Sequence, residues 1–174
     1  GTSRAGNELS PGMLIDFSKY FNQIIEINTA EKWVRVQPGI ILAELNKSLK
    51  KHGLYFPIDT STKDSATMGG MIANNSSGPH GVKYGTTRNH VKSVELVLSN
   101  GEIITTGNIS LQDAQAKAGN TLEGEIYHRI PGILDNYKDF LEEERPFTSK
   151  NSCGYYVWDL ISDDAIDITP LLVG

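Results

Sequence analysis

The sequence predicts an α+β fold in which antiparallel β-hairpins are flanked by helices. Two segments, residues 24–37 and 91–106, combine the alternating hydrophobicity of strands with a short turn. The segments with a helical period lie apart from these paired strands, so a doubly wound parallel sheet is not expected. A chain of 174 residues is about the size of one domain and is long enough to bury a core.

The first half of the chain is predicted to hold three strands and one amphipathic helix. Residues 13–17 follow a Ser-Pro-Gly turn and are expected to form a short strand. Residues 24–28 and 33–37 are expected to pair as a hairpin, because polar and apolar residues alternate in the second of them. Apolar residues then recur at helical spacing, which predicts a helix over residues 40–52 that ends at Gly53.

The second half contains the clearest hairpin signal. Residues 91–98 and 102–106 flank an Asn-Gly pair, which is the dipeptide that tight hairpin turns prefer. Residues 110–119 are expected to form a short helix with Ser110 as its N-cap.

A longer helical period runs through residues 122–141. Pro131 and Gly132 lie inside it and are expected to split or kink the helix. The acidic residues 142–144 at its end oppose the helix dipole, so fraying is expected there.

Composition excludes several classes of function. The net charge of −5 argues against nucleic acid as a partner. No stretch is long and apolar enough to predict a transmembrane segment. The single cysteine, Cys153, cannot form an internal disulfide or supply the cysteines of a zinc or iron–sulfur site, and no close histidine pair indicates a metal.

The two ends of the sequence suggest that it is part of something longer. The chain opens on Gly-Thr-Ser without a signal-peptide pattern, and it closes on the apolar run 168–174. We interpret it as a piece of a longer protein. A processed or tag-cleaved whole protein is the alternative.

Residues 57–88 form the most unusual segment, with five glycines among many Ser and Thr residues. Glycine allows a backbone to approach a ligand closely, and hydroxyl and amide groups donate to phosphate oxygens. A helix over residues 67–74 would present the free amides of Thr67–Gly70 to an anion. The alternative is an ordinary surface loop. The P-loop and the Rossmann glycine motif are both absent from the sequence.

Several stretches, taken in order, resemble the flavin-binding domain of the vanillyl-alcohol oxidase/p-cresol methylhydroxylase (PCMH) superfamily. The resemblance is closest to its branch of glycolate oxidase subunits and FAD-linked D-lactate and D-2-hydroxyacid dehydrogenases. The matching stretches are Gly1–Gly6, Val36–Gly39 with Leu45-Asn46, Pro57–Asp59, Ala66–Gly70, Asn74–Gly78, Lys83–Gly85, Glu95–Leu98 with Asn100–Glu102, Lys150–Tyr155 and Asp167–Gly174.

The resemblance implies FAD and a set of residues that contact it. Those residues are Gly1, Thr2, Ser3, Pro57, Asp59, Ser65, Ala66, Thr67, Gly69, Gly70, Asn74, Ser76, Ser77, Gly78, Tyr84 and Gly85. No local signature for covalent attachment is present, so the FAD is expected to be noncovalent. It also implies that residues 1–174 are a partial FAD-binding domain, the larger subdomain, without the small N-terminal subdomain, the C-terminal closing loop and the substrate cap. The fragment alone is therefore expected to be inactive and to hold FAD weakly or not at all.

For the intact protein the resemblance implies a flavin-dependent dehydrogenase of small 2-hydroxy acids, of lactate, glycolate or 2-hydroxyglutarate type. Its electron acceptor is unknown. An iron–sulfur cluster elsewhere in the full protein is left open, as is peripheral attachment of a cytoplasmic protein to the inner membrane. The alternatives are an FAD oxidase or reductase acting on another alcohol, sugar or cell-wall precursor, and a non-redox binding or scaffold domain. No catalytic acid or base is assigned to this chain.

Several single residues with reactive side chains each allow a functional and a structural interpretation. Of the histidines, His52, His90 and His128 are expected to be structural, whereas His80 either contacts flavin or substrate or lies on the surface. Asp59 either hydrogen-bonds flavin or fixes its own loop. Cys153 is expected to be a buried apolar residue rather than a redox thiol.

Four further residues complete the candidates. Lys83 and Arg88 either meet pyrophosphate charge or lie on a solvated face. Trp33 and Trp158 are expected in the core or at its rim rather than as stacking platforms.

Overall fold

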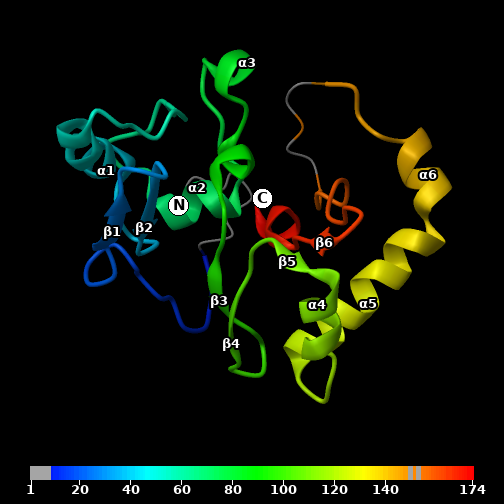
Figure 1. Cartoon of the computed structure of the whole chain (residues 1–174). Helices are drawn as coiled ribbons and strands as arrows, with labels where there is room; N and C mark the ends of the chain where they lie inside the picture. Colours follow the sequence, from blue (N-terminus) through cyan, green and yellow to red (C-terminus); the bar gives the residue numbers. More distant parts are fainter. Residues whose placement is uncertain (1–8, 149–150, 152–153) are drawn as a thin grey trace. The chain divides into compact units, whose positions relative to one another are not determined.

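The computed structural model describes residues 9–148, 151 and 154–174 (Figure 1). Its chain forms two compact units. Unit 1 comprises the residues up to Asn89 together with Gly174, and unit 2 comprises His90–Val173. Gly1, Thr2, Ser3 and Cys153, which the sequence singles out, lie outside the described residues.

Unit 1 contains the first predicted hairpin and helix. Strands β1 (Ile24–Asn28) and β2 (Trp33–Val36) pair antiparallel, with a bulge between Ile24 and Glu26. Helix α1 (Leu42–Leu49) continues as the 3-10 turn η1 (Lys50–His52). It begins two residues later than predicted, because Ile41 is extended and forms a β-bridge with Thr67. Gly53 ends it in the left-handed conformation at φ +69°.

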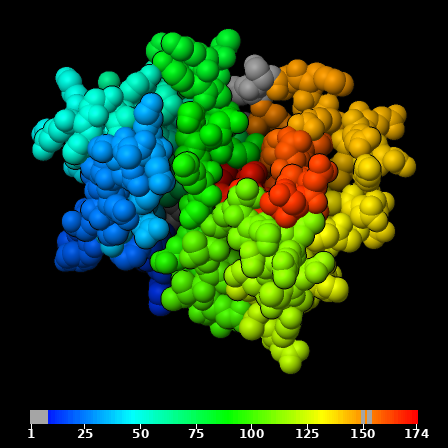
Figure 2. All heavy atoms as spheres, in the orientation of Figure 1, coloured from blue at the N-terminus to red at the C-terminus, as the bar shows by residue number. Residues whose placement is uncertain are grey.

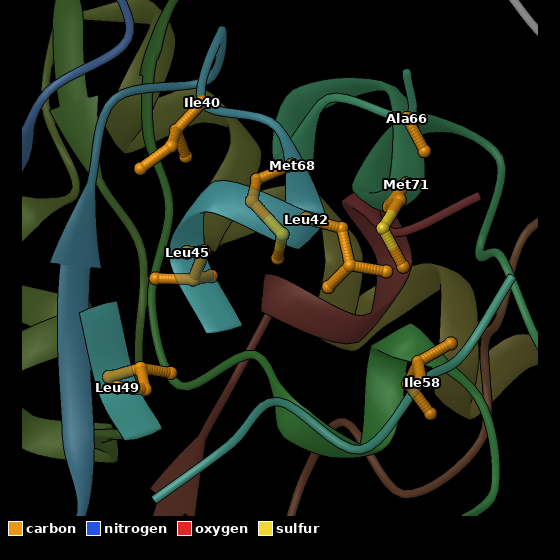
Figure 3. Close-up of a cluster of buried hydrophobic side chains, with 8 residues drawn as sticks. All are labelled: Ile40, Leu42, Leu45, Leu49, Ile58, Ala66, Met68 and Met71. Carbon is orange, nitrogen blue, oxygen red and sulfur yellow. The ribbon is translucent and has the colours of Figure 1, made fainter. Parts of the chain in front are cut away.

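The glycine-rich segment of unit 1 contains three short helical pieces. These are α2 (Met68–Ala73), α3 (Gly81–Tyr84) and the 3-10 turn η2 (Thr87–His90), whose last residue begins unit 2. The segment is anchored by Ile58, Ala66, Met68 and Met71, whose buried side chains join those of Ile40, Leu42, Leu45 and Leu49 in one core (Figure 3). This packing holds the candidate site residues on the face of a folded unit.

The predicted strand at residues 13–17 is wrong. These residues belong to no strand, and the side chains of Met13, Leu14 and Ile15 are exposed. An isolated strand needs a neighbour to satisfy its backbone, and none of the described strands pairs with this stretch. The stretch still carries Phe17, whose carbonyl oxygen lies so close to Gly39 that a side chain there would collide with it.

Unit 2 contains the second predicted hairpin and most of the helices. Strands β3 (Glu95–Val97) and β4 (Ile103–Thr105) pair antiparallel around a turn in which Gly101 has φ +88°. They are shorter than predicted, although the Val94 and Leu98 backbones still bond to Thr106 and Glu102 beyond the strand ends. A second pair, β5 (Ile109–Ser110) with β6 (Ala165–Ile166), joins distant segments and was not predicted.

The helices of unit 2 are α4 (Leu111–Lys117), α5 (Leu122–Asn136), α6 (Lys138–Glu143) and the 3-10 turn η3 (Thr169–Leu172). Ser110 caps α4 as predicted, since its hydroxyl accepts from the Asp113 amide at 3.0 Å. Of the two outcomes predicted at Pro131–Gly132, a split or a kink, the split is wrong, because α5 continues through both residues. The break falls at Tyr137, and α6 ends within the acidic run.

The core of unit 2 gathers Ala114, Tyr127, Ile166 and Ile168. In the view of Figure 2 the residues of α5 and α6, coloured yellow to orange, form part of the molecular surface. The side chains of Ile133, Tyr137 and Phe140 are all more than half exposed there.

The described residues contain helices and three small antiparallel sheets of two strands each. This combination confirms the α+β class. No helix in the described part of the chain is both long and apolar enough to cross a membrane.

Candidate functional site

The glycine-rich segment is fastened to the start of α1 by backbone hydrogen bonds. The amide of Leu42 donates to the Ala66 carbonyl at 2.9 Å, and the amides of Met68 and Gly69 donate to Ile40 and Pro38 at 2.9 and 2.8 Å. The residues before Pro57 are held as well, because the Asn46 carboxamide accepts from the Phe56 amide at 2.7 Å and donates to its carbonyl at 3.2 Å. Thus two of the sequence stretches singled out above, around Pro38 and at Asn46, position the site.

Three of the four amides that were predicted to meet an anion at the start of α2 already have partners in the chain. Thr67 is the N-cap, so the helix begins one residue later than predicted, and Thr67 Oγ1 accepts from the Gly70 amide at 3.3 Å. However, the amides of Met68, Gly69 and Gly70 all have partners within the chain, so none is free for a phosphate. The sequence could not show this, because two of the acceptors come from the distant residues Pro38 and Ile40.

Gly69 and Gly70 differ in the space that a Cβ atom would have at each position. A Cβ at Gly69 would lie 2.7 Å from Pro38 Cβ, so this glycine allows close packing of the segment on the Pro38 turn. A Cβ at Gly70 would meet only Thr67 Oγ1, at 3.1 Å. The packing of the described chain therefore gives little reason for a glycine at position 70.

Residues 74–78 are held in place by hydrogen bonds to η2. Asn75 is buried with φ +41°, and its side-chain oxygen accepts from the Arg88 amide at 3.0 Å. The Ser76 carbonyl accepts from both the amide and the hydroxyl of Thr87, at 2.9 and 2.7 Å. Gly174 also packs here, since a Cβ on it would collide with Asn75. Thr87 was not among the predicted site residues. The only sequence feature that could have indicated it is a hydroxyl residue two positions after Gly85.

Free hydrogen-bonding groups occur just beyond this point. Within the described part of the chain, the amides of Ser77 and Gly78 and the hydroxyls of Ser76 and Ser77 make no hydrogen bond. Gly78 is packed so closely on Asp59 that a Cβ would collide with its carbonyl and carboxylate. The turn thus brings free donors next to an acidic side chain.

Asp59 is paired through one of its oxygens only. Its Oδ2 lies 2.5 Å from His80 Nδ1, whereas its Oδ1 is buried and has no partner in the described residues. The hydrogen bond from His80 lowers the pKa of the Asp59 carboxyl, with burial acting against it. Both interpretations of Asp59 remain compatible with this arrangement, because Oδ2 fixes the loop and Oδ1 has no partner in the described residues.

Tyr84 forms a second polar group at the end of α3. Its hydroxyl lies 2.8 Å from that of Tyr55, and the Lys83 ammonium lies 5.0 Å from the centre of its ring. The hydrogen bond with Tyr55, followed by that with Lys83, lowers the pKa of Tyr84. Tyr55 was missed by the sequence analysis, since it lies outside every motif. Gly85, at φ +74°, then turns the chain toward η2.

The remaining histidines and tryptophans lie where the sequence predicts them. His52 ends η1, His90 lies in η2 and His128 lies in α5, as expected. Trp33 and Trp158 are half-buried, and their indole N–H groups donate to Glu31 and to the Leu141 carbonyl. No group of three or more potential metal ligands occurs among the residues that the structure describes.

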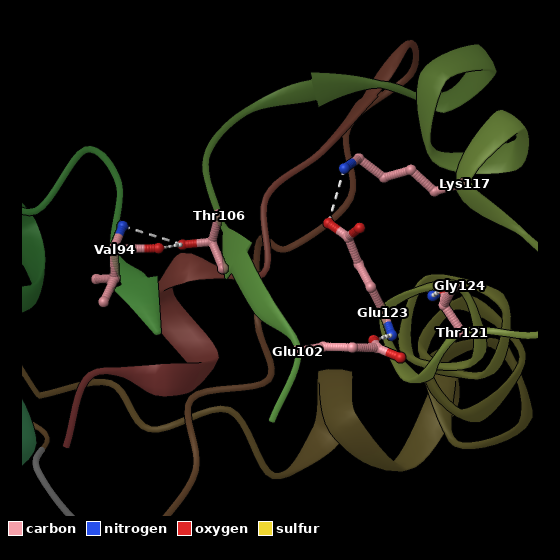
Figure 4. A network of polar contacts seen from close by, with 7 residues as sticks. All are labelled: Val94, Glu102, Thr106, Lys117, Thr121, Glu123 and Gly124. Carbon is pink, nitrogen blue, oxygen red and sulfur yellow. Dashed lines mark hydrogen bonds and ion pairs between the residues drawn. The ribbon is translucent and has the colours of Figure 1, made fainter. Parts of the chain in front are cut away.

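A depression of about 540 Å³ lies in unit 2, lined by the turn at Asn100, residues 118–122 and the first turns of α5. The amides of Leu122 and Glu123 at this helix end already donate to the Glu102 carboxylate, each at 3.2 Å. Figure 4 shows the hydrogen bond from Glu123. None of the predicted site residues lines this depression.

Comparison with known proteins identifies relatives of the chain. The D-2-hydroxyglutarate dehydrogenases of Pantoea ananatis and Escherichia coli are 36% and 34% identical over all of it. The chain spans only 17% of the length of either relative. The glycolate oxidase subunit GlcD of Bacillus subtilis is 40% identical over 65% of this chain, which corresponds to 24% of that relative.

A family model for an FAD binding domain matches residues 1–107, the part of the chain that holds the turn at Ser77–Gly78 and the Asp59 carboxylate. This chain therefore belongs to that family of FAD binding domains, and the cofactor that its sequence predicts, FAD, is confirmed with it.

Proposed function

We propose that this chain is the flavin-binding part of an FAD-dependent oxidoreductase that oxidises a small 2-hydroxy acid. We take residues 1–174 to be the larger subdomain of a PCMH-type domain. The small subdomain, the closing loop and the substrate cap would then lie elsewhere in the polypeptide. A cytoplasmic location with peripheral contact at the inner membrane stays a prediction.

The observation that carries the proposal is the unused hydrogen-bonding capacity between Asp59 and Gly78. Buried polar atoms are normally paired, so a buried carboxylate oxygen without a partner indicates a ligand. Beside it, the Ser77 and Gly78 amides offer donors. FAD presents both N–H and O–H donors and carbonyl and phosphate acceptors, so these groups fit it.

The residues that would hold FAD follow from this arrangement. Asp59, Ser76, Ser77 and Gly78 would bond to it directly. The stretch from Ser65 to Gly70 would offer a close surface, because the side of Gly70 where a Cβ would project is open except for Thr67 Oγ1. Pro57, Asn74, Tyr84 and Gly85 would complete the site, together with the loop of Gly1, Thr2 and Ser3.

The substrate class rests on the relatives. Relatives of the chain are named for D-2-hydroxyglutarate, glycolate and D-lactate, all of which are 2-hydroxy acids. When bound, flavin supplies the acceptor for a hydride from the carbinol carbon, and the protein binds and orients both partners.

The experiment uses the intact protein. We expect it to purify with FAD that denaturation releases, and to reduce an artificial electron acceptor with at least one of lactate, glycolate or 2-hydroxyglutarate. Flavin present, with turnover only of other alcohols or sugars, would favour an oxidase or reductase of different specificity. Absence of flavin, with no uptake of added FAD, would favour a non-redox binding domain.

A further inference from the structure

We infer that an apolar stripe on α5 and α6 is the docking surface for a helix of the same polypeptide, from a part that lies outside residues 1–174. The stripe consists of Ile133, Tyr137 and Phe140, whose side chains are 51%, 60% and 60% exposed. One premise comes from the proposed function, namely that the intact protein is longer than this chain. Neither flavin nor substrate is needed for the docking.

The stripe continues a face of α5 that unit 2 already covers in part. Ile126 and Ile130 on this face are partly buried against the core of unit 2. Together with the stripe they form a run of apolar residues spaced alternately by four and three positions. Residues at these spacings share one face of an α-helix. The core therefore covers the first part of the face, and the second part is exposed among the described residues.

The break between α5 and α6 does not interrupt this face. The Tyr137 amide donates to the Ile133 carbonyl at 3.3 Å, and the Leu141 amide donates to the Tyr137 carbonyl at 2.9 Å. Because these bonds keep the spacing of an α-helix, α6 carries on from α5 (Figure 1). The Trp158 indole also donates to the Leu141 carbonyl at 2.9 Å, so α6 is fastened within unit 2.

The composition and spacing of the stripe favour a helix as its partner. Single exposed apolar residues are common on protein surfaces, whereas a contiguous apolar stripe indicates an interaction surface. Alternating spacings of four and three positions are the pattern by which two helices pack along each other. Tyr137 and Phe140 supply the large aromatic side chains that anchor such contacts.

The charges beside the stripe indicate the chemistry of this partner. Glu142, Glu143 and Glu144 are exposed at the end of α6 and form no ion pair with another residue that the structure describes. A partner with complementary charge would place Lys or Arg beside its apolar face. We therefore expect an amphipathic helix with a basic edge.

The relatives indicate which chain supplies this helix. Four of them match 89% to 100% of this chain, and the match is only 16% to 18% of their own length. Four others match 65% to 72% of this chain, and the match is 20% to 24% of their length. The relatives that share more of this chain are thus the longer polypeptides.

Helices α5 and α6 lie in the part of the chain that distinguishes these groups. The family model ends at residue 107, before both helices, whereas three of the longer relatives match the whole chain, with both helices included. The D-2-hydroxyglutarate dehydrogenase of Stutzerimonas stutzeri is one of the shorter relatives, and it matches 66% of this chain. The printed name is therefore common to both groups. The two helices accompany extra length, and we assign the docking helix to that extra length.

The test introduces the photoreactive residue benzoylphenylalanine in place of Phe140 in the intact protein. After irradiation, mass spectrometry identifies the peptide that is cross-linked to position 140. We expect a peptide from outside residues 1–174. Mixing ¹⁴N- and ¹⁵N-labelled protein beforehand should give cross-links of uniform label only, because both peptides belong to one polypeptide. The matched control places the same group at Asp135, an exposed residue on another face of α5, and should not capture that peptide.

A second measurement uses hydrogen exchange in the intact protein. In the double variant Ile133→Ser, Phe140→Ser, exchange over residues 133–141 should accelerate about tenfold or more, because docking of these side chains protects the helix. The control is Asp135→Ser, Glu142→Ser, which changes two exposed residues on the other side of the same helices. Its exchange should stay within about threefold of the wild type.

Three results would overturn the inference. A cross-link of mixed label would make the stripe an interface between two copies. A cross-link to residues within 1–174 of the same copy would show that this chain covers the stripe itself. No cross-link, with exchange alike in the two double variants, would show that the stripe stays in water. Because neither readout involves flavin, the expected cross-link in a protein without flavin would contradict the proposed function alone.

Discussion

Two glycine-containing turns of unit 1 have similar sequences and opposite hydrogen bonding. At the start of α2, the amides of Met68, Gly69 and Gly70 all have partners in the chain. At Ser77 and Gly78 the amides have none in the described residues, and the buried Asp59 Oδ1 beside them is also unpaired. Both turns are rich in Gly, Ser and Thr, yet the Met68–Gly70 amides are paired whereas the Ser77 and Gly78 amides are free in the described part of the chain.

The difference lies in the neighbours of each turn. The first turn packs on the backbone at Pro38 and Ile40, which uses its donors to hold the segment in place. The start of α5 in unit 2 behaves in the same way, since Glu102 accepts from its amides. A helix N-terminus is therefore an anion site only where the fold leaves its amides unpaired.

The largest effect is expected from Gly78→Ala. Its Cβ would collide with backbone and carboxylate atoms of Asp59, which cannot move without opening the turn. We expect local stability of unit 1 to fall by about 1–3 kcal/mol and most of the flavin to be lost. Flavin absorbance of the purified intact protein and native-state hydrogen exchange over residues 74–85 measure the two effects.

Gly81→Ala is the matched control for Gly78→Ala, three residues away. A Cβ there meets nothing within 4 Å. Flavin content and exchange should match the wild type, with a gain of up to about 1 kcal/mol in α3 from the better helix former. Equal flavin loss in both variants would show that the whole turn, rather than the contact of Gly78 with Asp59, is sensitive.

A smaller effect is expected in the first turn, from Gly69→Ala compared with Gly70→Ala. The Cβ at Gly69 would press on Pro38, so we expect α2 to be destabilised by about 1–2 kcal/mol. The Cβ at Gly70 meets only Thr67 Oγ1, and higher helix propensity offsets that contact, so stability should change by less than about 0.5 kcal/mol.

Hydrogen exchange over residues 66–76 separates these two variants. If the open side of Gly70 faces the cofactor, Gly70→Ala should still lower the flavin content. Full flavin retention in Gly70→Ala would mean that this face is not part of the site. An equal loss of stability in both variants would contradict the packing difference between them.

What the sequence predicts well is local. The hairpin turn at Asn100-Gly101, the cap at Ser110 and the end of the helix before Gly53 all depend on residues within a few positions. They are present in the structure as predicted. The motif stretches also predicted the family, because their order along the chain carries more information than any single match.

What the sequence predicts poorly depends on distant partners. Residues 13–17 have a strand pattern but no neighbouring strand among the described residues, and the pairing of β5 with β6 joins residues far apart in sequence. The same holds for the site. No local pattern predicts that Asp59 pairs with His80, or that the Met68 and Gly69 amides donate to the Ile40 and Pro38 carbonyls.

The smallest effect is expected at the α5 N-terminus, from Glu102→Gln. Hydrogen bonds from the Leu122 and Glu123 amides lower the pKa of Glu102 in the folded state. Because this pKa is lowered, the Glu102 carboxylate stabilises the fold at pH values above its pKa in the unfolded chain, which is about 4.3. This stabilisation is lost as the pH falls through the pKa of the folded state. At pH 7, hydrogen exchange of the first turn of α5 should therefore be faster in Glu102→Gln than in the wild type. At a pH below both pKa values, the exchange rates of the variant and the wild type should converge.

The control is Glu95→Gln, which changes an exposed glutamate on the neighbouring strand β3. Its exchange should match the wild type at every pH. A difference between Glu102→Gln and wild type that persists in acid would mean that the shape of the side chain, not its charge, holds the hairpin to the helix.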